Sequence, residues 1–345
     1  MPNLRWGILA AGNIAGAFTR DLIANGMSVA AVGSRSLSKA RAFAADHGIA
    51  VAHGSYEALM EDADVDVIYI ATPHPFHCSA AALAIRSGKH VLIEKPVTLN
   101  AAEARYLEEL ALDYDVVVME AMWTRFLPHM RRIRDLVANG TIGEIRSIVA
   151  TNAQVLPSDP EHRLNNLALG GGALLDLGVY PVSFAMDLLG KPDTVIATGR
   201  LRPTGADAEV SVMFRYNGGA SALLSASSDA SGPNTAFIGG SNGHIVIDGD
   251  WYTPTTFAVF DSEGCCWERY FGGEIIGRGM HFQALELQSL VDTGRRSSEI
   301  MPFEQSIEIM GVMDDIRSQI GVSYEADALS RQFEKSPPEP TRESV

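Results

Sequence analysis

Short apolar runs alternate with amphipathic stretches over the first 120 residues of the chain. Such runs between turn residues are typical of buried strands, and the amphipathic stretches are typical of helices that cover a sheet. Strands are predicted at 4–10, 28–34, 67–71, 90–93 and 116–119, and helices at 14–25, 37–46, 56–61, 77–87 and 101–112. This alternation predicts a parallel sheet with right-handed crossovers and helices on both faces.

The pattern changes after about residue 120, where short alternating runs become frequent. Helices are predicted at 128–139, 172–189, 280–293 and 304–320, and strands at 145–155, 194–202, 208–216, 219–227, 234–240, 243–248 and 255–260. This spacing predicts one large, mostly antiparallel sheet. The expected fold is therefore α/β. A doubly wound parallel-sheet domain is predicted at 1–121, an α+β domain at 122–333 and a loose tail at 334–345.

Charge and cysteine content narrow the class of protein. The 345 residues carry a net charge of −15, which disfavours binding to nucleic acid or to an anionic membrane. The three cysteines, Cys78, Cys265 and Cys266, have no metal-type spacing and fit a reducing compartment. We see neither a signal peptide nor an uninterrupted apolar run long enough to span a bilayer. We expect a cytoplasmic protein without a metal site.

A glycine-containing turn joins the first predicted strand to the first helix. The segment from Gly7 to Gly16 is similar to the dinucleotide-binding fingerprint, with alanines where its first and third glycines usually stand. Ala11, Gly12, Asn13 and Ile14 would bring backbone N–H groups to a pyrophosphate at the helix N-terminus. A degenerate motif of this kind can also serve only the turn. Its place at the start of a doubly wound pattern favours a Rossmann dinucleotide-binding domain.

The end of the second strand indicates which dinucleotide would bind. An NAD site normally has an acidic residue here for the ribose 2′-hydroxyl, but the chain has Ser34 and Arg35, with Lys39 one turn later. Arginine can pair with a 2′-phosphate, so we expect NADP, with NAD less favoured. The alternative is that the two cations belong to an ordinary solvated helix start.

Several polar residues follow the later strands of the parallel sheet, where ligands bind in folds of this type. Thr72 and His77 would lie along the nicotinamide half of the cofactor, and we reject a metal site at His74 and His77 because no third ligand is nearby. Lys95 comes directly after Glu94 at the end of the next strand. Asp176 and Tyr180 are four residues apart and would share one face of a helix. Lysine, tyrosine and aspartate beside a nucleotide fold suggest an acid/base set.

Three segments together resemble the glucose–fructose oxidoreductase/inositol dehydrogenase family. They are the loop at 10–15, Glu94-Lys95-Pro96, and the run at 170–180 that ends in Tyr180. Many members have histidine at the position of Tyr180. Tyrosine there, together with the segment at 120–126, resembles the dimeric dihydrodiol dehydrogenase and NADP-dependent D-xylose dehydrogenase branch. The resemblance extends to about residue 330, and Ala10 in place of the first glycine is its main departure.

The resemblance implies hydride transfer between a nicotinamide and a secondary alcohol or hemiacetal of a sugar, cyclic polyol or trans-dihydrodiol. Tyr180 would transfer the hydroxyl proton, with its pKa lowered by the cation of Lys95, and Asp176 would orient the substrate or the lysine. Lys95 as the proton-transfer residue remains a second hypothesis. Glu94 and Lys95 would also contact the cofactor, and the resemblance suggests a cis peptide bond before Pro96.

Three further residues are expected on the substrate side of the site. Arg163 could reach a substrate hydroxyl or carboxylate, and Trp123 and Phe126 could form an apolar wall. The alternative for both aromatic residues is a place in the core. The second sheet would leave one face uncovered by helices, so we expect a homodimer through it. Two alternatives stay open: a non-catalytic dinucleotide sensor, and an enzyme that uses transient hydride transfer in a non-redox reaction.

Overall fold

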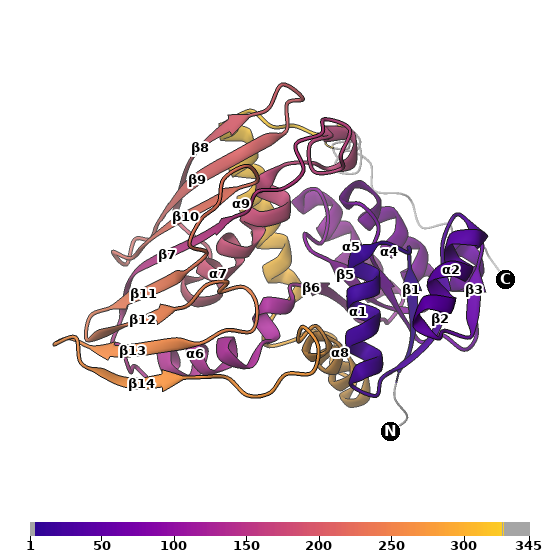
Figure 1. Ribbon diagram of the computed structural model, residues 1–345, viewed down its shortest axis with the longest axis horizontal. Coiled ribbons are helices and arrows are strands. Elements are labelled where there is room, and N and C mark those ends of the chain that lie inside the picture. Colours follow the sequence, from indigo (N-terminus) through magenta and orange to yellow (C-terminus); the bar gives the residue numbers. More distant parts are fainter. Residues whose placement is uncertain (1–3, 326, 328–345) are drawn as a thin grey trace.

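The computed structural model describes residues 4–325 and residue 327, arranged as two sheets with helices between and around them (Figure 1). The smaller sheet belongs to the N-terminal part of the chain and the larger to the C-terminal part. Helices of the C-terminal part fill the space between the large sheet and the N-terminal domain (Figure 1). The predicted tail at 334–345 lies outside the described residues.

The N-terminal domain is a six-stranded parallel sheet in the order β3-β2-β1-β4-β5-β6, as the alternation predicts. Its strands are β1 (Arg5–Leu9), β2 (Ser28–Gly33), β3 (Val51–His53), β4 (Val67–Ile70), β5 (His90–Glu94) and β6 (Val118–Ala121). Its helices are α1 (Asn13–Ala24), α2 (Leu37–His47), α3 (Tyr56–Met60), α4 (His77–Arg86) and α5 (Ala101–Asp113). The edge strand β3 was not predicted, because three partly exposed residues form no recognisable apolar run.

The C-terminal part is built around an eight-stranded sheet in the order β14-β13-β12-β11-β7-β10-β9-β8. Its strands are β7 (Ile145–Ala153), β8 (Thr194–Leu201), β9 (Asp207–Arg215), β10 (Ser221–Ser227), β11 (Ala236–Gly240), β12 (Gly243–Ile247), β13 (Phe257–Asp261) and β14 (Cys266–Tyr270). All neighbours pair antiparallel except β7 and β10, which pair parallel. The exposed strand β14 was missed, since it has no buried face to mark it.

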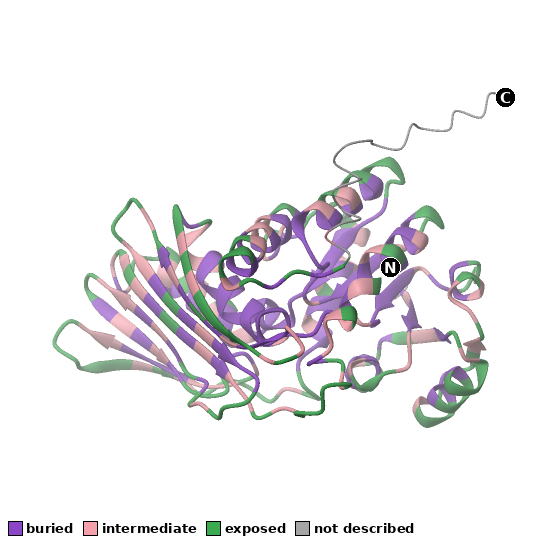
Figure 2. Cartoon of the chain, turned by 90° about the horizontal axis from the view of Figure 1, so that it is seen from above, coloured by how far each residue is buried: buried purple, intermediate pink, exposed green. Residues whose placement is uncertain are grey.

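Among the described residues, helices lie against only one face of this large sheet (Figure 1). The helices of this part are α6 (Pro128–Ala138), α7 (Val179–Leu189), α8 (His281–Thr293) and α9 (Phe303–Ile320), with short 3₁₀ turns at Trp123–Phe126 and Leu167–Leu169. A further 3₁₀ turn, His74–Phe76, precedes α4 in the N-terminal domain. Buried residues alternate with exposed ones along the strands, as expected for a sheet with one face on the core (Figure 2). α9 packs against both α5 and β8 and so joins the two domains.

The helix predicted at 172–189 contains a change of geometry. Leu174–Gly178 forms a π-helical turn, and the α-helix begins only at Val179. Single π turns often occur at functional sites, and this one contains Asp176. The stretch Leu167–Leu189 is long and apolar enough to cross a membrane by composition, but 72% of its most apolar window is buried inside the fold. Core helices pass the same test, so this is weak evidence for a membrane span.

Candidate active site

A cavity of about 840 Å³ lies where the carboxyl ends of the parallel strands face the C-terminal part. Both parts of the chain supply its walls. From the N-terminal domain come Ala10, Gly12, Asn13, Ile14, Ala71, Thr72, Pro73, His74, His77, Glu94 and Lys95. From the C-terminal part come Trp123, Gln154, Leu156, His162, Arg163, Asp176, Leu177, Tyr180, Asp250, Tyr252, Thr253 and Arg278.

The loop before α1 is shaped to receive an anionic group. Gly12 is the N-cap of α1, and a methyl group built on it would meet no other atom within 4 Å. No side chain caps the first turn of α1, and no acidic residue lies in it. Its backbone N–H groups therefore keep their hydrogen-bonding capacity for a ligand, which fits the pyrophosphate of a dinucleotide.

The residues predicted to select NADP lie on the same edge of the sheet, at the end of β2. Ser34 is buried, and its hydroxyl accepts a hydrogen bond from the Ser36 backbone N–H at 3.3 Å. Arg35 is exposed, with its guanidinium 5.8 Å from the centre of the Phe76 ring, and Lys39 is exposed in the first turn of α2. Arg35 also interacts with the Tyr56 hydroxyl, and neither cation is among the residues that line the cavity, so their contact with a phosphate beside β2 stays a prediction.

The His77 ring contacts two turns of the cofactor wall. Its ring is fully buried, with Nδ1 2.9 Å from the Pro96 carbonyl oxygen and Nε2 2.8 Å from that of Thr72. Burial lowers the pKa of His77, and a neutral ring donates to one of these carbonyls at a time. The ring therefore supports the Thr72 turn of the cofactor wall, and its predicted contact with the cofactor stays a prediction. The Lys95–Pro96 peptide bond is cis, as the resemblance suggested.

Lys95 links the two halves of the site. Its Nζ donates to the Asp176 carbonyl oxygen at 2.7 Å and lies 3.5 Å from the Asp176 carboxylate oxygen Oδ1. The same Nζ is 4.9 Å from the centre of the Tyr180 ring. Burial acts to lower the pKa of Lys95, but Asp176, Tyr180 and Glu94 raise it above its ordinary value. Lys95 is therefore an ammonium ion at neutral pH.

Asp176 is the permanent anion of the site. Burial opposes its ionisation, but Lys95, Arg163 and His74 together lower its pKa to about 2. The nearest guanidinium nitrogen of Arg163 is 3.6 Å from Asp176 Oδ1, and the Arg163 side chain is 47% exposed. Arg163 therefore has room to reach a ligand from this position. His74, which the sequence offered only as a rejected metal ligand, is buried with its Nδ1 3.1 Å from the Gly170 carbonyl oxygen.

Tyr180 is placed between Lys95 and Trp123. The indole Nε1–H of Trp123 donates to the Tyr180 hydroxyl oxygen at 3.0 Å. Because indole nitrogen can only donate, the phenol keeps its own proton available for another acceptor. Burial raises the pKa of Tyr180 and outweighs the opposing effects of Lys95 and Trp123. The sequence predicted that Lys95 lowers the pKa of Tyr180. Lys95 does act in that direction, but burial has the larger effect, so the predicted net shift was wrong.

A second carboxylic acid, Glu94, lies next to the cation of Lys95. Glu94 is buried, accepts a hydrogen bond from the Tyr69 hydroxyl and lines the cavity. Burial raises its pKa to about 7, although Tyr69 and Lys95 act in the opposite direction. The site thus combines a neutral phenol, an ammonium ion, a carboxylate and a carboxyl group that titrates near neutrality.

Comparisons with known proteins agree with this geometry. Residues 4–122 match an oxidoreductase family with an NAD-binding Rossmann fold, and residues 130–246 match the GFO/IDH/MocA C-terminal domain. Trans-1,2-dihydrobenzene-1,2-diol dehydrogenase of Xenopus tropicalis is 36% identical over 331 residues, covering 93% of this chain and 99% of the relative. The human enzyme of the same name is 34% identical over 339 residues, covering 94% and 99%. The chain belongs to the GFO/IDH/MocA oxidoreductase family.

A solved structure extends the likeness to the arrangement of the domains. The 3-ketoreductase from Actinomadura kijaniata, in complex with NADP and TDP-benzene, superposes with a TM-score of 0.80 at 26% identity, covering 92% of this chain and 98% of that one. The predicted family, the fold class and the assignment as an oxidoreductase enzyme are thereby confirmed. The roles of individual site residues in this GFO/IDH/MocA chain stay predictions.

The substrate side of the cavity was only partly foreseen. Trp123 lines the cavity, but Phe126 is fully buried and is not among the lining residues, so its predicted place in a substrate wall does not fit the structure. A polar wall was missed. In it, the Tyr252 hydroxyl accepts from Gln154 Nε2 at 3.0 Å, and the Asp250 carboxylate accepts from Asn234 Nδ2 at 3.0 Å.

These wall residues had no recognisable pattern in the sequence. Gln154 follows a strand, and Asp250 and Tyr252 lie on a loop almost a hundred residues later, so only the tertiary fold brings them together. Within 4–325 and at 327, no group of three or more His, Cys, Asp or Glu side chains could hold a metal ion.

Proposed function

We propose that this enzyme is an NADP-dependent dehydrogenase or reductase that acts on a secondary alcohol, or the corresponding carbonyl, of a trans-dihydrodiol, cyclic polyol or sugar. The observation that carries the proposal is the convergence of Lys95, Asp176 and Tyr180 in a cavity that also contains the anion-binding loop at Gly12. Relatives named trans-dihydrodiol dehydrogenase support the substrate class, and Arg35 in place of an acid supports NADP.

The bound nicotinamide would accept or supply the hydride, and the protein would move the proton. Tyr180 carries a proton that Trp123 leaves available, so it can protonate a carbonyl oxygen during reduction. Lys95 can donate a hydrogen bond to the same oxygen and stabilise negative charge there. Asp176 holds Lys95 in place through the contacts described above. In the oxidative direction Tyr180 must first lose its proton, and the rate of alcohol oxidation should therefore rise with pH.

The polar wall suits a substrate with several hydroxyl groups. Gln154, Tyr252 and Asp250 face the cavity opposite the cofactor wall, while Trp123 supplies an apolar surface. Apolar contacts on one side and hydrogen-bonding groups on the other are the arrangement that a polyhydroxylated ring requires.

The test measures the absorbance of reduced nicotinamide with NADP⁺ or NAD⁺ and a panel of trans-dihydrodiols, inositols and aldoses. Tyr180→Phe and Lys95→Met should each lower kcat/KM by roughly a hundredfold or more. Tyr216→Phe is the matched control, because its hydroxyl bonds to the Gly190 carbonyl at 3.2 Å, away from the cavity. Dinucleotide binding without any turnover would instead favour a sensor or a reaction without net redox change.

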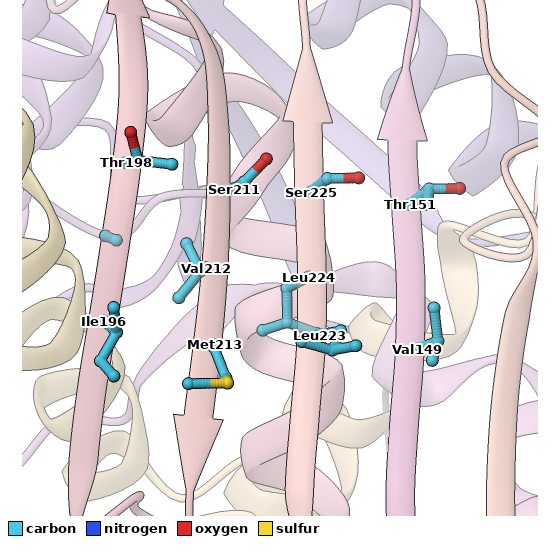
Figure 3. A pocket seen from close by; sticks show the side chains of 11 residues that line it. Val149, Thr151, Ile196, Thr198, Ser211, Val212, Met213, Leu223, Leu224 and Ser225 are labelled. Carbon is cyan, nitrogen blue, oxygen red and sulfur yellow. The ribbon is translucent and has the colours of Figure 1, made fainter.

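We also propose that the enzyme is a homodimer through the uncovered face of the large sheet. Side chains from four neighbouring strands form an apolar row across this face, with a row of hydroxyl groups beside it (Figure 3). The apolar row consists of Ile196, Met213, Leu223 and Val149, and the hydroxyl row of Thr198, Ser211, Ser225 and Thr151. Leu223 is 53% exposed at the centre of the apolar row. A twofold axis through such a face would bury it against itself.

Sedimentation equilibrium tests the dimer. Leu223→Lys should shift the protein towards the monomer, because a two-copy contact would bury two added charges near the axis. Leu112→Lys is the control, since Leu112 is 58% exposed on α5, away from the sheet. A monomeric wild-type protein, or a dimer unaffected by Leu223→Lys, would contradict this arrangement.

A further inference from the structure

The segment between β14 and α8 crosses from the C-terminal part to the helix that begins at the anion-binding loop. The Asp21 carboxylate, buried on α1, accepts hydrogen bonds from the Arg278 backbone N–H at 3.0 and 2.9 Å and from that of Met280 at 2.8 Å. Asn25, which caps the C-terminus of α1, donates to the Ile276 carbonyl at 3.3 Å. The backbone at residue 278 is therefore positioned by α1.

Two glycines allow this close approach. Gly277 and Gly279 have φ angles of +78° and +87°, which residues with a Cβ rarely adopt. A Cβ at Gly277 would overlap the Asp21 carboxylate, and one at Gly279 would lie 2.7 Å from a methyl carbon of Leu127. The backbone on both sides of Arg278 is thus packed against neighbouring side chains, and this fixes the position of the Arg278 Cα.

The Arg278 side chain extends into the cavity. Its guanidinium lies 5.6 Å from the centre of a Trp123 ring, and the residue lines the cavity together with Gly12 and Asn13. Burial and Glu94 raise the pKa of the Tyr69 phenol, and the charge of Arg278 acts on it in the opposite direction. In the part of the chain that the structure describes, no hydrogen bond or ion pair involves this guanidinium, whereas Lys95 and Arg163 both contact Asp176.

We propose that Arg278 is a further cofactor-binding residue, supplied by the C-terminal part, whose guanidinium pairs with the pyrophosphate of the bound dinucleotide. This inference rests on the proposed function. A guanidinium can bind two phosphate oxygens at once, and here it would add charge to the uncapped N-terminus of α1. A substrate anion is the alternative partner, because the guanidinium also lies beside Trp123 of the substrate wall, and the experiment below separates the two.

The test is direct measurement of ligand affinity by calorimetry, without turnover. NADPH contains the pyrophosphate, whereas 2′-AMP has the adenosine and its 2′-phosphate alone. Arg278→Ala should weaken NADPH binding by about tenfold or more and leave 2′-AMP binding unchanged. Arg278→Lys should recover part of the loss, because it restores the charge without the fork of donors. Arg35→Ala should weaken both ligands, and Arg131→Ala, exposed on α6, should weaken neither.

Four results would overturn the inference. Unchanged NADPH affinity in Arg278→Ala would refute the inference about Arg278 but leave the proposed function intact. Unchanged affinity with a raised KM for the alcohol would assign Arg278 to the substrate instead. Equal losses for NADPH and 2′-AMP would show that the guanidinium does not act on the pyrophosphate. If the wild-type protein bound neither NADPH nor NADH, the proposed function would fail and the inference with it.

Discussion

The two walls of the cavity are built in different ways. The cofactor wall comes from consecutive turns of one parallel sheet, and a backbone loop before α1 forms its centre. The opposite wall takes side chains from segments that are distant in the sequence, such as Gln154, Asp176 and Tyr252. A local sequence motif can therefore encode the first wall, but the second exists only once the large sheet has folded.

Two glycines, Gly12 in the cofactor wall and Gly172 in the turn before Asp176 of the opposite wall, allow the sharpest test of this difference. Gly172 has a φ of +144°, and a Cβ on it would overlap the buried Asp207 carboxylate, which accepts from the Leu174 N–H at 2.6 Å. Gly172→Ala should lower the free energy of unfolding by about 2–4 kcal/mol. Gly12→Ala should change it by less than about 0.5 kcal/mol, since its Cβ would meet nothing.

Ligand binding should show the opposite order. A methyl group at Gly12 would fill the space that a pyrophosphate approaches, so Gly12→Ala should weaken NADPH binding by about tenfold or more. Urea denaturation and calorimetry on the two variants measure both effects. Equal destabilisation by the two alanines, or full NADPH affinity in Gly12→Ala, would contradict the division between a structural glycine and a cofactor-binding glycine.

The success of sequence analysis follows the same division. Strand–turn–helix units and the positions of Gly12 and Lys95 could be predicted, because short-range patterns encode them. In the opposite wall, Asp176 and Tyr180 were found through the run at 170–180 and the family resemblance, while Gln154 and Tyr252 were missed. The protonation of Tyr180 could not be predicted, since burial outweighs the neighbouring cation only in the folded protein. Phe126 was misplaced because a sequence does not show which side of a 3₁₀ turn faces the core.

The buried Glu94 carboxyl group, in the cofactor wall, should make the stability of the protein depend on pH. Burial raises its pKa from 4.5 to about 7, so the folded state binds more protons than the unfolded state between these values. Stability should therefore fall as pH rises from about 4.5 to 7. Glu94→Gln removes this titration and should be more stable than the wild type at pH 8, by on the order of 1–3 kcal/mol.

The advantage of Glu94→Gln should shrink to less than about 0.5 kcal/mol at pH 4.5, where the carboxyl group is protonated in the folded wild type and half protonated in the unfolded chain. Urea denaturation at pH 4.5 and pH 8 measures it, with Glu161→Gln at an exposed position as the control. An advantage of equal size at both pH values would show that the substitution acts through packing and not through titration.

Trp123 allows the C-terminal wall to be tested through the reaction itself. Trp123→Phe removes the Nε1–H that donates to the Tyr180 hydroxyl at 3.0 Å, so the pKa of Tyr180 should rise further. The pH profile of kcat/KM for alcohol oxidation should move upward by about one unit. A profile that only decreases in height, without moving, would mean that Trp123 contacts the substrate but does not tune Tyr180.

The smallest expected effect lies at the start of the cofactor loop. Ala10 has a φ of +82°, a conformation that costs a residue with a Cβ about 1–2 kcal/mol. Ala10→Gly removes that strain but makes the unfolded chain more flexible, which costs about 0.5–1 kcal/mol. The net result should be a gain in unfolding free energy of roughly 0.5 kcal/mol. Ala11→Gly, next to it and without a positive φ, should show only the loss. Equal destabilisation by both glycines in urea denaturation would show that the positive φ at Ala10 carries no strain. Alanine would then stabilise this turn as well as the glycine that the family fingerprint usually has at this position.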